Sequence, residues 1–298
     1  EPGEEAAVLT DFLQYAAGFG HLVHYNGQQF DLPFLHRRCE HYGLAEDLLA
    51  RPSLDLCRAV RPAKALCSLP SCRQKAVEDY LGIRRDDRYD GGQLISVYHE
   101  YTQTRDPERL ALLLLHNEED VLHLPLLLPM MAYPQFLAEK KRLAGTGSVT
   151  LKERPEEICL EAPLRTALPR KASFRTEDWY GILSGQTLRL RIPLFHGELH
   201  YYYENYRDYY YLPEEDAAIH KSVAVYMDKE HRQKATADTC YTRQSGTFLP
   251  LPDKMPPDAS LPVFRAGRRS PGYVKYDPDL LTGPDFLEHY LDALIKQA

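Results

Sequence analysis

The chain has 298 residues, of which 44% are hydrophobic, and its formal net charge is −7. This length accommodates two domains of ordinary size, and the apolar fraction is typical of folded soluble proteins. No apolar run approaches the roughly 20 residues of a membrane-spanning helix, so we expect no membrane contact. The acidic balance argues against non-specific nucleic-acid binding through bulk charge, although it leaves a local binding groove open.

The six cysteines form no C-x-x-C pair and no dense disulfide scaffold. This pattern predicts a reducing, cytoplasmic location with isolated buried thiols. Cys57, Cys67 and Cys72 are close in sequence, and His36 or His41 offers a further zinc ligand. The spacing fits no structural zinc pattern, so isolated thiols are the favoured interpretation.

The first half of the chain alternates between short apolar strands and amphipathic helices. We expect, in chain order, a helix over 3–17, a strand over 21–25, a helix over 31–42, a short strand or extended piece over 53–60, helices over 71–83 and 91–104, and an apolar helix that opens at Asp106 and Pro107. Pro33 fits the first turn of the helix over 31–42, and Gly43 fits its end. Pro125 predicts a kink in the last helix near Val121 to Leu124.

The composition changes after Met131, where Gly, Thr, Ser and mixed charge replace the apolar periodicity. We therefore expect one domain over 1–145 and a second over 146–298. The second domain has the pattern of an α+β fold without a recognisable function. Its expected elements are strands over 186–195, 197–203 and 208–212, with the last two as a tyrosine-rich hairpin, and helices over 213–227 and 283–297. The tyrosines would either stack on bases or pack as ordinary strand residues, and the absence of an adjoining basic stripe favours ordinary packing.

Two stretches each place an aspartate in an apolar setting beside an amide side chain: YNGQQFD at 25–31 and HNEEDV at 116–121. On a helix, His116 and Asp120 are four residues apart and share one face. A carboxylate beside an imidazole suits metal-assisted hydrolysis, because the carboxylate binds a divalent cation and the imidazole orients or deprotonates a water. Two simpler interpretations stay open: Asp31 caps the next helix, and His116 and Asp120 form a solvated surface pair.

In this order and separation, the two stretches resemble the second and third motifs of the DEDD class of 3′–5′ exonucleases, which have the ribonuclease-H-like fold. They are most similar to a group of predicted bacterial RNase-H-like exonucleases, over about residues 1–133. The resemblance implies an α/β fold class, in which a truncated RNase-H-like domain precedes a smaller α+β domain. It also implies a cytoplasmic, metal-dependent nuclease that hydrolyses DNA or RNA from a single-stranded 3′ end.

The resemblance implies that Asp31 and Asp120 ligate Mg²⁺ or Mn²⁺ and that His116 positions the attacking water. One branch of the class has Tyr four residues before the last Asp, and the other has His five residues before it. In this chain the histidine, His116, stands four residues before Asp120, so the two side chains lie on the same face of a helix. By the same resemblance, Asn26 and Phe30 flank the substrate strand, and Asn117 contacts the substrate or supports the ligands.

The first motif of the class, Asp-x-Glu on a central strand, is absent, since only twenty residues precede the stretch HLVHYNGQQFD, which begins at His21. Paired cations about 3.5–4 Å apart need several carboxylates, and Asp31 and Asp120 alone are too few. We therefore expect a two-metal site only where the first motif is supplied, and little or no nuclease activity from this chain. The alternative is a catalytically inactive nucleic-acid-binding or scaffold protein with the same fold. Without the strands of the first motif, exposed apolar helix faces would favour self-association.

Overall fold

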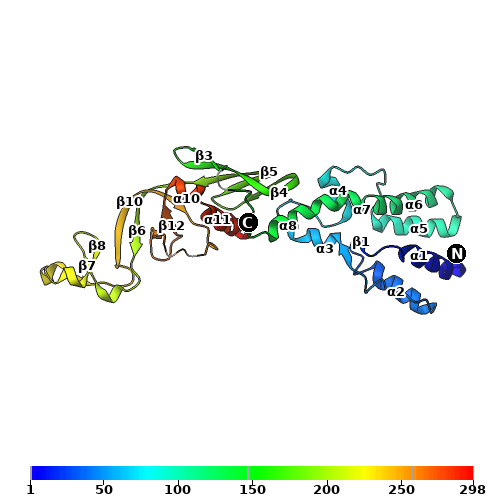
Figure 1. The fold of residues 1–298 in the computed structure, drawn as a ribbon, viewed down its shortest axis with the longest axis horizontal. Coiled ribbons are helices and arrows are strands. Elements are labelled where there is room, and N and C mark those ends of the chain that lie inside the picture. The colour runs from blue at the N-terminus through cyan, green and yellow to red at the C-terminus, as the bar shows by residue number, and fades with distance from the viewer. Residues whose placement is uncertain (1, 146–147, 257, 259, 298) are drawn as a thin grey trace. The chain divides into compact units, whose positions relative to one another are not determined.

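The computed structural model describes residues 2–145, 148–256, 258 and 260–297. It divides into two compact units, each described separately: unit 1 is Glu1–Ala138 with Leu168–Ala172, and unit 2 is Glu139–Ala167 with Ser173–Ala298. Helices and strands both occur, so the fold is mixed (Figure 1). Residues 146 and 147, where the sequence predicts the second domain to begin, lie outside the described residues.

Unit 1 is mainly helical and contains one small parallel sheet (Figure 1). Its elements are η1 (Pro2–Glu4), α1 (Glu5–Ala16), β1 (Leu22–His24), α2 (Asp31–His41), β2 (Ser53–Asp55), α3 (Leu56–Val60), η2 (Arg61–Ala63), α4 (Gln74–Leu81), α5 (Gly91–Thr104), α6 (Pro107–Leu122), α7 (Leu124–Leu127), η3 (Leu128–Met131) and α8 (Ala132–Ala138). β1 and β2 run parallel, with His24 opposite Asp55. The strand predicted over 53–60 ends at Asp55, because the Asp55 carboxylate accepts a hydrogen bond from the Arg58 N–H at 3.2 Å and begins α3.

The helix ends of unit 1 follow from local sequence signals. Gly43, which follows the C-cap residue Tyr42 of α2, has φ +63°, and the N–H of Leu44 donates to the carbonyl of Cys39 at 2.9 Å. A side chain disfavours this left-handed backbone, so a glycine is suited to end the helix there. α6 ends at Leu122, and the chain bends by 44° before the helical segment Leu124–Ala138. The kink predicted from Pro125 is therefore confirmed.

The core of unit 1 is formed by apolar residues of several short elements. Its fully buried side chains include Leu56, Leu127, Met130, Tyr133 and Phe136. α5 and α6 lie side by side (Figure 1), but none of the α6 residues is buried. Three large apolar side chains of this helix are exposed: Leu114, Val121 and Leu122. Among the described residues, no single helix passes a length and hydropathy test for crossing a membrane, whereas the bent pair of Pro107–Leu122 and Leu124–Ala138 passes it jointly.

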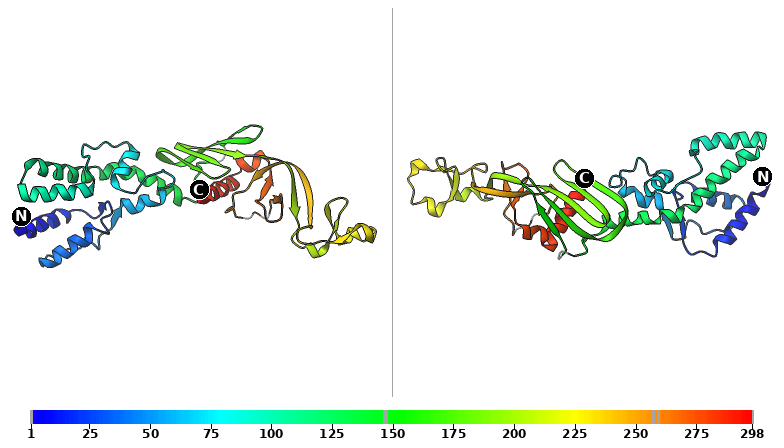
Figure 2. Two further views of the ribbon diagram at one scale, coloured as in Figure 1. Left: turned by 180° about the vertical axis from the view of Figure 1, so that it is seen from behind. Right: turned by 90° about the horizontal axis from the view of Figure 1, so that it is seen from above.

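Unit 2 contains most of the strands. Its elements are β3 (Thr150–Glu153), β4 (Glu157–Arg175), β5 (Tyr180–Pro193), β6 (Phe195–Tyr202), η4 (Tyr206–Asp208), β7 (Tyr209–Leu212), β8 (Ala217–His220), α9 (Lys221–Ala224), η5 (Lys229–His231), β9 (Gln233–Lys234), β10 (Tyr241–Pro250), β11 (Phe264–Arg265), β12 (Tyr273–Lys275), α10 (Pro278–Thr282) and α11 (Pro284–Gln297), with part of β4 counted in unit 1. The strands form the sheets β3-β4-β5 and β8-β7-β9 and a closed sheet of β10, β12, β11 and β6. Figure 2 shows the green, yellow, orange and red ribbons of this unit from two further sides. The terminal helix predicted over 283–297 is confirmed as α11.

Two expectations for the tyrosine-rich region are wrong. The predicted hairpin between 197–203 and 208–212 does not form, because β6 pairs with β10 while β7 pairs with β8 and β9. The helix predicted over 213–227 is limited to α9, and Ala217–His220 is the strand β8. The cause lies at Asp216, which has φ +49° and accepts hydrogen bonds from the hydroxyls of Tyr211 and Tyr241 at 2.6 and 2.5 Å. These contacts fix a turn that returns the chain as a strand.

Candidate functional site

His116 and Asp120 lie on one face of α6, as their spacing predicts. The Nε2 atom of His116 is 3.3 Å from Oδ2 of Asp120. The other ring nitrogen, Nδ1, is 2.6 Å from Oδ2 of Asp87, in the loop 82–90 that joins α4 to α5. An ionised carboxylate only accepts hydrogen bonds, so Nδ1 carries the proton in this contact. In the neutral imidazole, Nε2 is then the atom that accepts a proton, and it faces Asp120.

Asp87 is buried and fully hydrogen-bonded. Its side chain is 1% exposed, and its Oδ2 atom lies 2.7 Å from Nζ of Lys75. Its Oδ1 atom accepts a hydrogen bond from the N–H of Tyr89 at 2.9 Å. Burial disfavours the charged form of Asp87, but hydrogen bonds from Lys75, His116 and the Tyr89 backbone outweigh it and lower the pKa of Asp87 to about 2. This carboxylate is therefore ionised at neutral pH.

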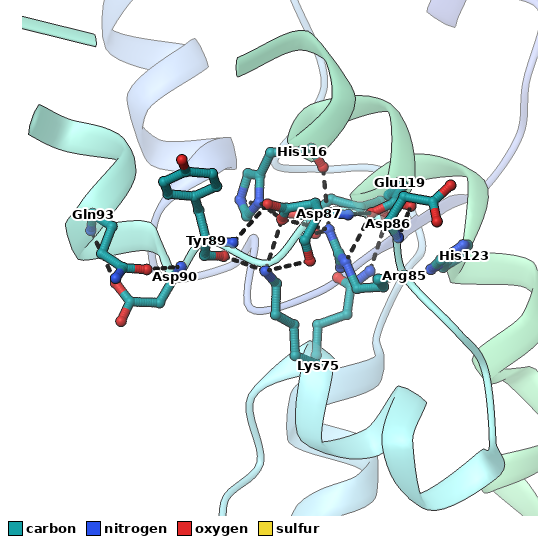
Figure 3. A network of polar contacts seen from close by, with 12 residues as sticks. Lys75, Arg85, Asp86, Asp87, Tyr89, Asp90, Gln93, His116, Glu119 and His123 are labelled. Carbon is teal, nitrogen blue, oxygen red and sulfur yellow. Dashed lines mark hydrogen bonds and ion pairs between the residues drawn. The ribbon is translucent and has the colours of Figure 1, made fainter. Parts of the chain in front are cut away.

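Arg85 is the centre of the same network (Figure 3). Its side chain is 6% exposed, and its guanidinium reaches Asp120 at 2.7 Å, Glu78 at 3.1 Å and Glu119 at 3.2 Å. A fourth carboxylate, Asp87, lies 3.6 Å away. Burial alone would lower the pKa of Arg85, but the carboxylates of Asp120 and Glu78 outweigh it and raise this pKa above its ordinary value. Arg85 is thus a permanent positive charge among four acids.

The two glutamates of the network bind the loop 82–90 to its neighbours. Glu78, on α4, is fully buried and also accepts a hydrogen bond from Gln74 at 3.0 Å. Glu119, on α6, accepts hydrogen bonds from the N–H groups of Asp86 and Asp87 at 2.8 and 3.1 Å. Burial acts to raise the pKa of Glu119, but these backbone donors outweigh it and lower that pKa. The loop is therefore attached to α6 by its backbone as well as by Arg85.

His116 and Asp120 border a pocket of about 910 Å³ on unit 1. The other lining residues come from the segment before α4, from α4 itself and from the start of α5; they include Ser68, Arg73, Lys75 and Asp90. The imidazole therefore meets a space large enough for a small ligand or a nucleotide. This pocket is the place in unit 1 where the His116–Asp120 pair can act on another molecule.

Asp31 is not part of this network. It is the first residue of α2, whose N-cap is Phe30 and has no side-chain capping bond, so Asp31 does not cap the helix. Within the described ranges, the Asp31 carboxylate has no hydrogen-bond or ion-pair partner, and it is exposed. No hydrogen bond or ion pair links Asp31 to Asp120 there.

The proposed substrate residues lie in two places. Asn26 has φ +61° in the turn after β1, and its N–H donates to Oδ1 of Asp55 at 2.9 Å. Phe30 is 67% exposed beside Asp31. Asn117 is exposed on α6, next to His116. The structure thus groups Asn117 with His116 and Asp120, and it groups Asn26 and Phe30 with Asp31.

These residues do not fit a divalent cation as they are arranged. One carboxylate oxygen of Asp120 is paired with the guanidinium of Arg85 at 2.7 Å, and the other faces Nε2 of His116 at 3.3 Å. Among the described residues, no group of three or more His, Cys, Asp or Glu side chains is placed to hold a metal ion. The surface-pair interpretation of His116 and Asp120 is also incomplete, because Asp87 and Arg85 join them to a buried network.

Arg85, Asp87 and Glu78 are not among the site residues predicted from the sequence. The first two belong to the stretch RRDDRYD at 84–90, in which three arginines and three aspartates occur within seven residues. Such a dense mixture of charges between two helices is a signal for an ion-pair network. No comparable sequence signal marks Glu78, because its position has the pattern of an ordinary polar residue on an amphipathic helix.

A protein-family model described as the RNase H superfamily matches residues 1–132, a little under half of the chain. The match supports an RNase-H-like domain in this part of the chain. It does not distinguish the DEDD exonuclease group within that superfamily. Searches of curated proteins and of solved structures found no match.

Proposed function

We propose that the RNase-H-like part of this chain acts on nucleic acid as a metal-dependent 3′–5′ exonuclease, which hydrolyses the terminal phosphodiester of a single-stranded DNA or RNA end. The family match supports a nuclease-type fold that binds nucleic acid in general. The observation that carries the proposed exonuclease activity is the chain of contacts from Asp87 through His116 to Asp120, at the edge of an open pocket. Within it, Asp87 orients the imidazole so that Nε2 can accept a proton from an attacking water.

The proposal assigns Asp31 and Asp120 as ligands of Mg²⁺ or Mn²⁺, and Asn26, Phe30 and Asn117 as substrate contacts. The Asp120 carboxylate is paired with Arg85, and Asp31 is separate from the network. We therefore expect the 298-residue chain by itself to hydrolyse nucleic acid only slowly.

The test is a nuclease assay on single-stranded DNA and RNA oligonucleotides labelled at the 5′ end, with Mg²⁺ or Mn²⁺ in excess. The expected result is slow, stepwise shortening from the 3′ end that is lost in His116→Ala and Asp120→Asn. Glu118→Gln is the matched control, because Glu118 is an exposed acid on the same helix. Rapid hydrolysis by the unmodified chain would contradict the expected low activity. Shortening that persists in Asp120→Asn would contradict the assigned site.

The second candidate is a nucleic-acid-binding or scaffold protein without catalysis. The observation that favours it is the ion pair of 2.7 Å between Arg85 and Asp120, which occupies the acid expected to bind a metal. This candidate predicts that a fluorescent single strand binds equally well with Mg²⁺ and with a chelator, while no shortening occurs even at long incubation.

A further inference from the structure

Four carboxylates and two basic side chains meet in the network around α6. The acids are Glu78, Asp87, Glu119 and Asp120, and the basic residues are Arg85 and Lys75. Figure 3 labels Asp87, Glu119, Arg85 and Lys75 among them. Lys75 is occupied at the edge of the network by Asp87 and by the carbonyl of Tyr89. Arg85 is the cation that reaches Asp120, and it does so at 2.7 Å.

We propose that Arg85 holds the Asp120 carboxylate in the place of a divalent cation, so that the guanidinium and a cation compete for this group. The inference rests on the proposed role of Asp120 as a cation ligand. It makes Arg85 an internal lock on the site, because Asp120 becomes a free ligand only when the guanidinium leaves it.

The geometry of the guanidinium suits this role. One planar group with five N–H donors contacts Asp120, Glu78 and Glu119 and also donates to the carbonyl of His116 at 3.3 Å. A divalent cation at Asp120, whose side chain is 37% exposed, would lie close to this positive charge. The two positive charges repel each other, so the guanidinium opposes cation binding at this carboxylate.

The lock can open without detaching the loop that carries it. The N–H groups of Asp86 and Asp87 donate to Glu119, and these bonds do not involve the Arg85 side chain. A rotation of the Arg85 side chain therefore releases Asp120 while the loop 82–90 stays attached to α6. The pocket beside Asp120 provides the space from which a cation or a substrate phosphate approaches.

The test measures Mn²⁺ binding by the loss of the free-ion electron paramagnetic resonance signal, with Arg85→Gln compared against the unmodified chain. Arg85→Gln should bind Mn²⁺ at least tenfold more tightly. Arg84→Gln is the matched control, since it removes the same charge from the neighbouring exposed residue, which has no ion pair among the described residues. Arg84→Gln should leave the Mn²⁺ affinity unchanged within twofold. An equal gain in both variants would show a general charge effect and overturn the proposal.

The gained affinity must depend on Asp120. Adding Asp120→Asn to Arg85→Gln should abolish the gain, and persistence of the gain would overturn the proposal. Because Arg85→Gln leaves the buried Glu78 without its guanidinium partner, the double variant Glu78→Gln with Arg85→Gln is measured in parallel. It keeps Asp87, Glu119 and Asp120, and it should show the same gain in a folded chain, as checked by circular dichroism. No gain in this folded double variant would overturn the proposal.

The result also separates this inference from the proposed function. Tighter Mn²⁺ binding without nuclease activity would support the lock and count against the exonuclease. Nuclease activity that requires Asp120 in the unmodified chain, with no gain of affinity in Arg85→Gln, would support the exonuclease and overturn the lock.

Discussion

The Oδ2 atom of Asp87 lies 2.6 Å from Nδ1 of His116, and this contact determines which imidazole nitrogen carries the proton. Asp87 comes from the loop between α4 and α5, whereas His116 comes from α6. The contact therefore extends the His116–Asp120 pair on one helix into a chain of three residues drawn from two segments. Asp87 is a positioning residue for the imidazole, and its replacement should alter both stability and activity.

Replacing Asp87 by Asn should lower the free energy of unfolding by about 2 kcal/mol or more, because a buried charged acceptor of several hydrogen bonds is lost. Lys75 would also lose its ion-pair partner at 2.7 Å. Urea unfolding followed by circular dichroism measures the change. Asp86→Asn is the control, since this neighbouring side chain is exposed, and it should stay within about 0.5 kcal/mol of the unmodified chain. Equal effects of the two substitutions would show that the network does not depend on Asp87.

Lowering the pH from about 4 to 2 should remove the stabilisation that the ionised Asp87 side chain gives to the folded chain. Burial opposes its ionisation, but its hydrogen bonds prevail and lower the pKa from 3.8 to about 2 in the folded chain. Between pH 4 and 2 the unfolded chain binds the proton more readily, so the stabilisation is complete above about pH 4 and is lost as the pH falls through about 2. Over this range, the stability difference between the unmodified chain and Asp87→Asn should shrink by about 2 kcal/mol. A difference that stays constant from pH 4 to 2 would contradict the lowered pKa.

The helices of unit 1 were predictable because their signals are local. The helix predicted over 91–104 coincides with α5, whose start is fixed by the capping box of Asp90 and Gln93. The kink beside Pro125 is equally local. The strand pairing of unit 2 was not predictable, because β6 finds its partner in β10, some forty residues later in the chain. The local sequence pattern favoured a hairpin between β6 and β7, but in the structure β6 pairs with β10 and β7 pairs with β8 and β9.

In the candidate site, too, the local relationship was predictable from the sequence and the long-range contacts were not. The spacing of His116 and Asp120 on a helix was enough to predict that they share a face, and they do so at 3.3 Å. The partners of this pair were not predictable, because Asp87 and Arg85 reach it from a loop whose path depends on tertiary contacts with Glu119. Sequence patterns report which residues lie on one element. Sequence patterns do not report which charged side chain from another element will pair with those residues.

In unit 2, the hydroxyl of Tyr290 joins two buried groups. It accepts a hydrogen bond from Nε1 of Trp179 at 2.7 Å and donates to the carbonyl of Pro250 at 2.7 Å. Tyr290→Phe would leave both partners unsatisfied, at a cost of about 2–3 kcal/mol. Trp179 is the single tryptophan of the chain, so its fluorescence during urea unfolding reports on unit 2 directly. Tyr226→Phe, at a position 91% exposed, should change nothing, and a loss as large as that in Tyr290→Phe would contradict the assignment.

Gly181 on β5 should not tolerate even one added carbon. A Cβ atom there would lie 2.1 Å from Cζ of the buried Phe174 ring, whereas at Gly246 on β10 the nearest atom would be 3.9 Å away. Gly181→Ala should therefore lower the free energy of unfolding by about 1–3 kcal/mol, and Gly246→Ala should have a much smaller effect. Adding Phe174→Leu makes room for the new carbon, so the double variant should lose less than the sum of the two single losses. Strictly additive losses would mean that Phe174 is not the obstacle, and the close packing of β5 against this ring would have to be abandoned.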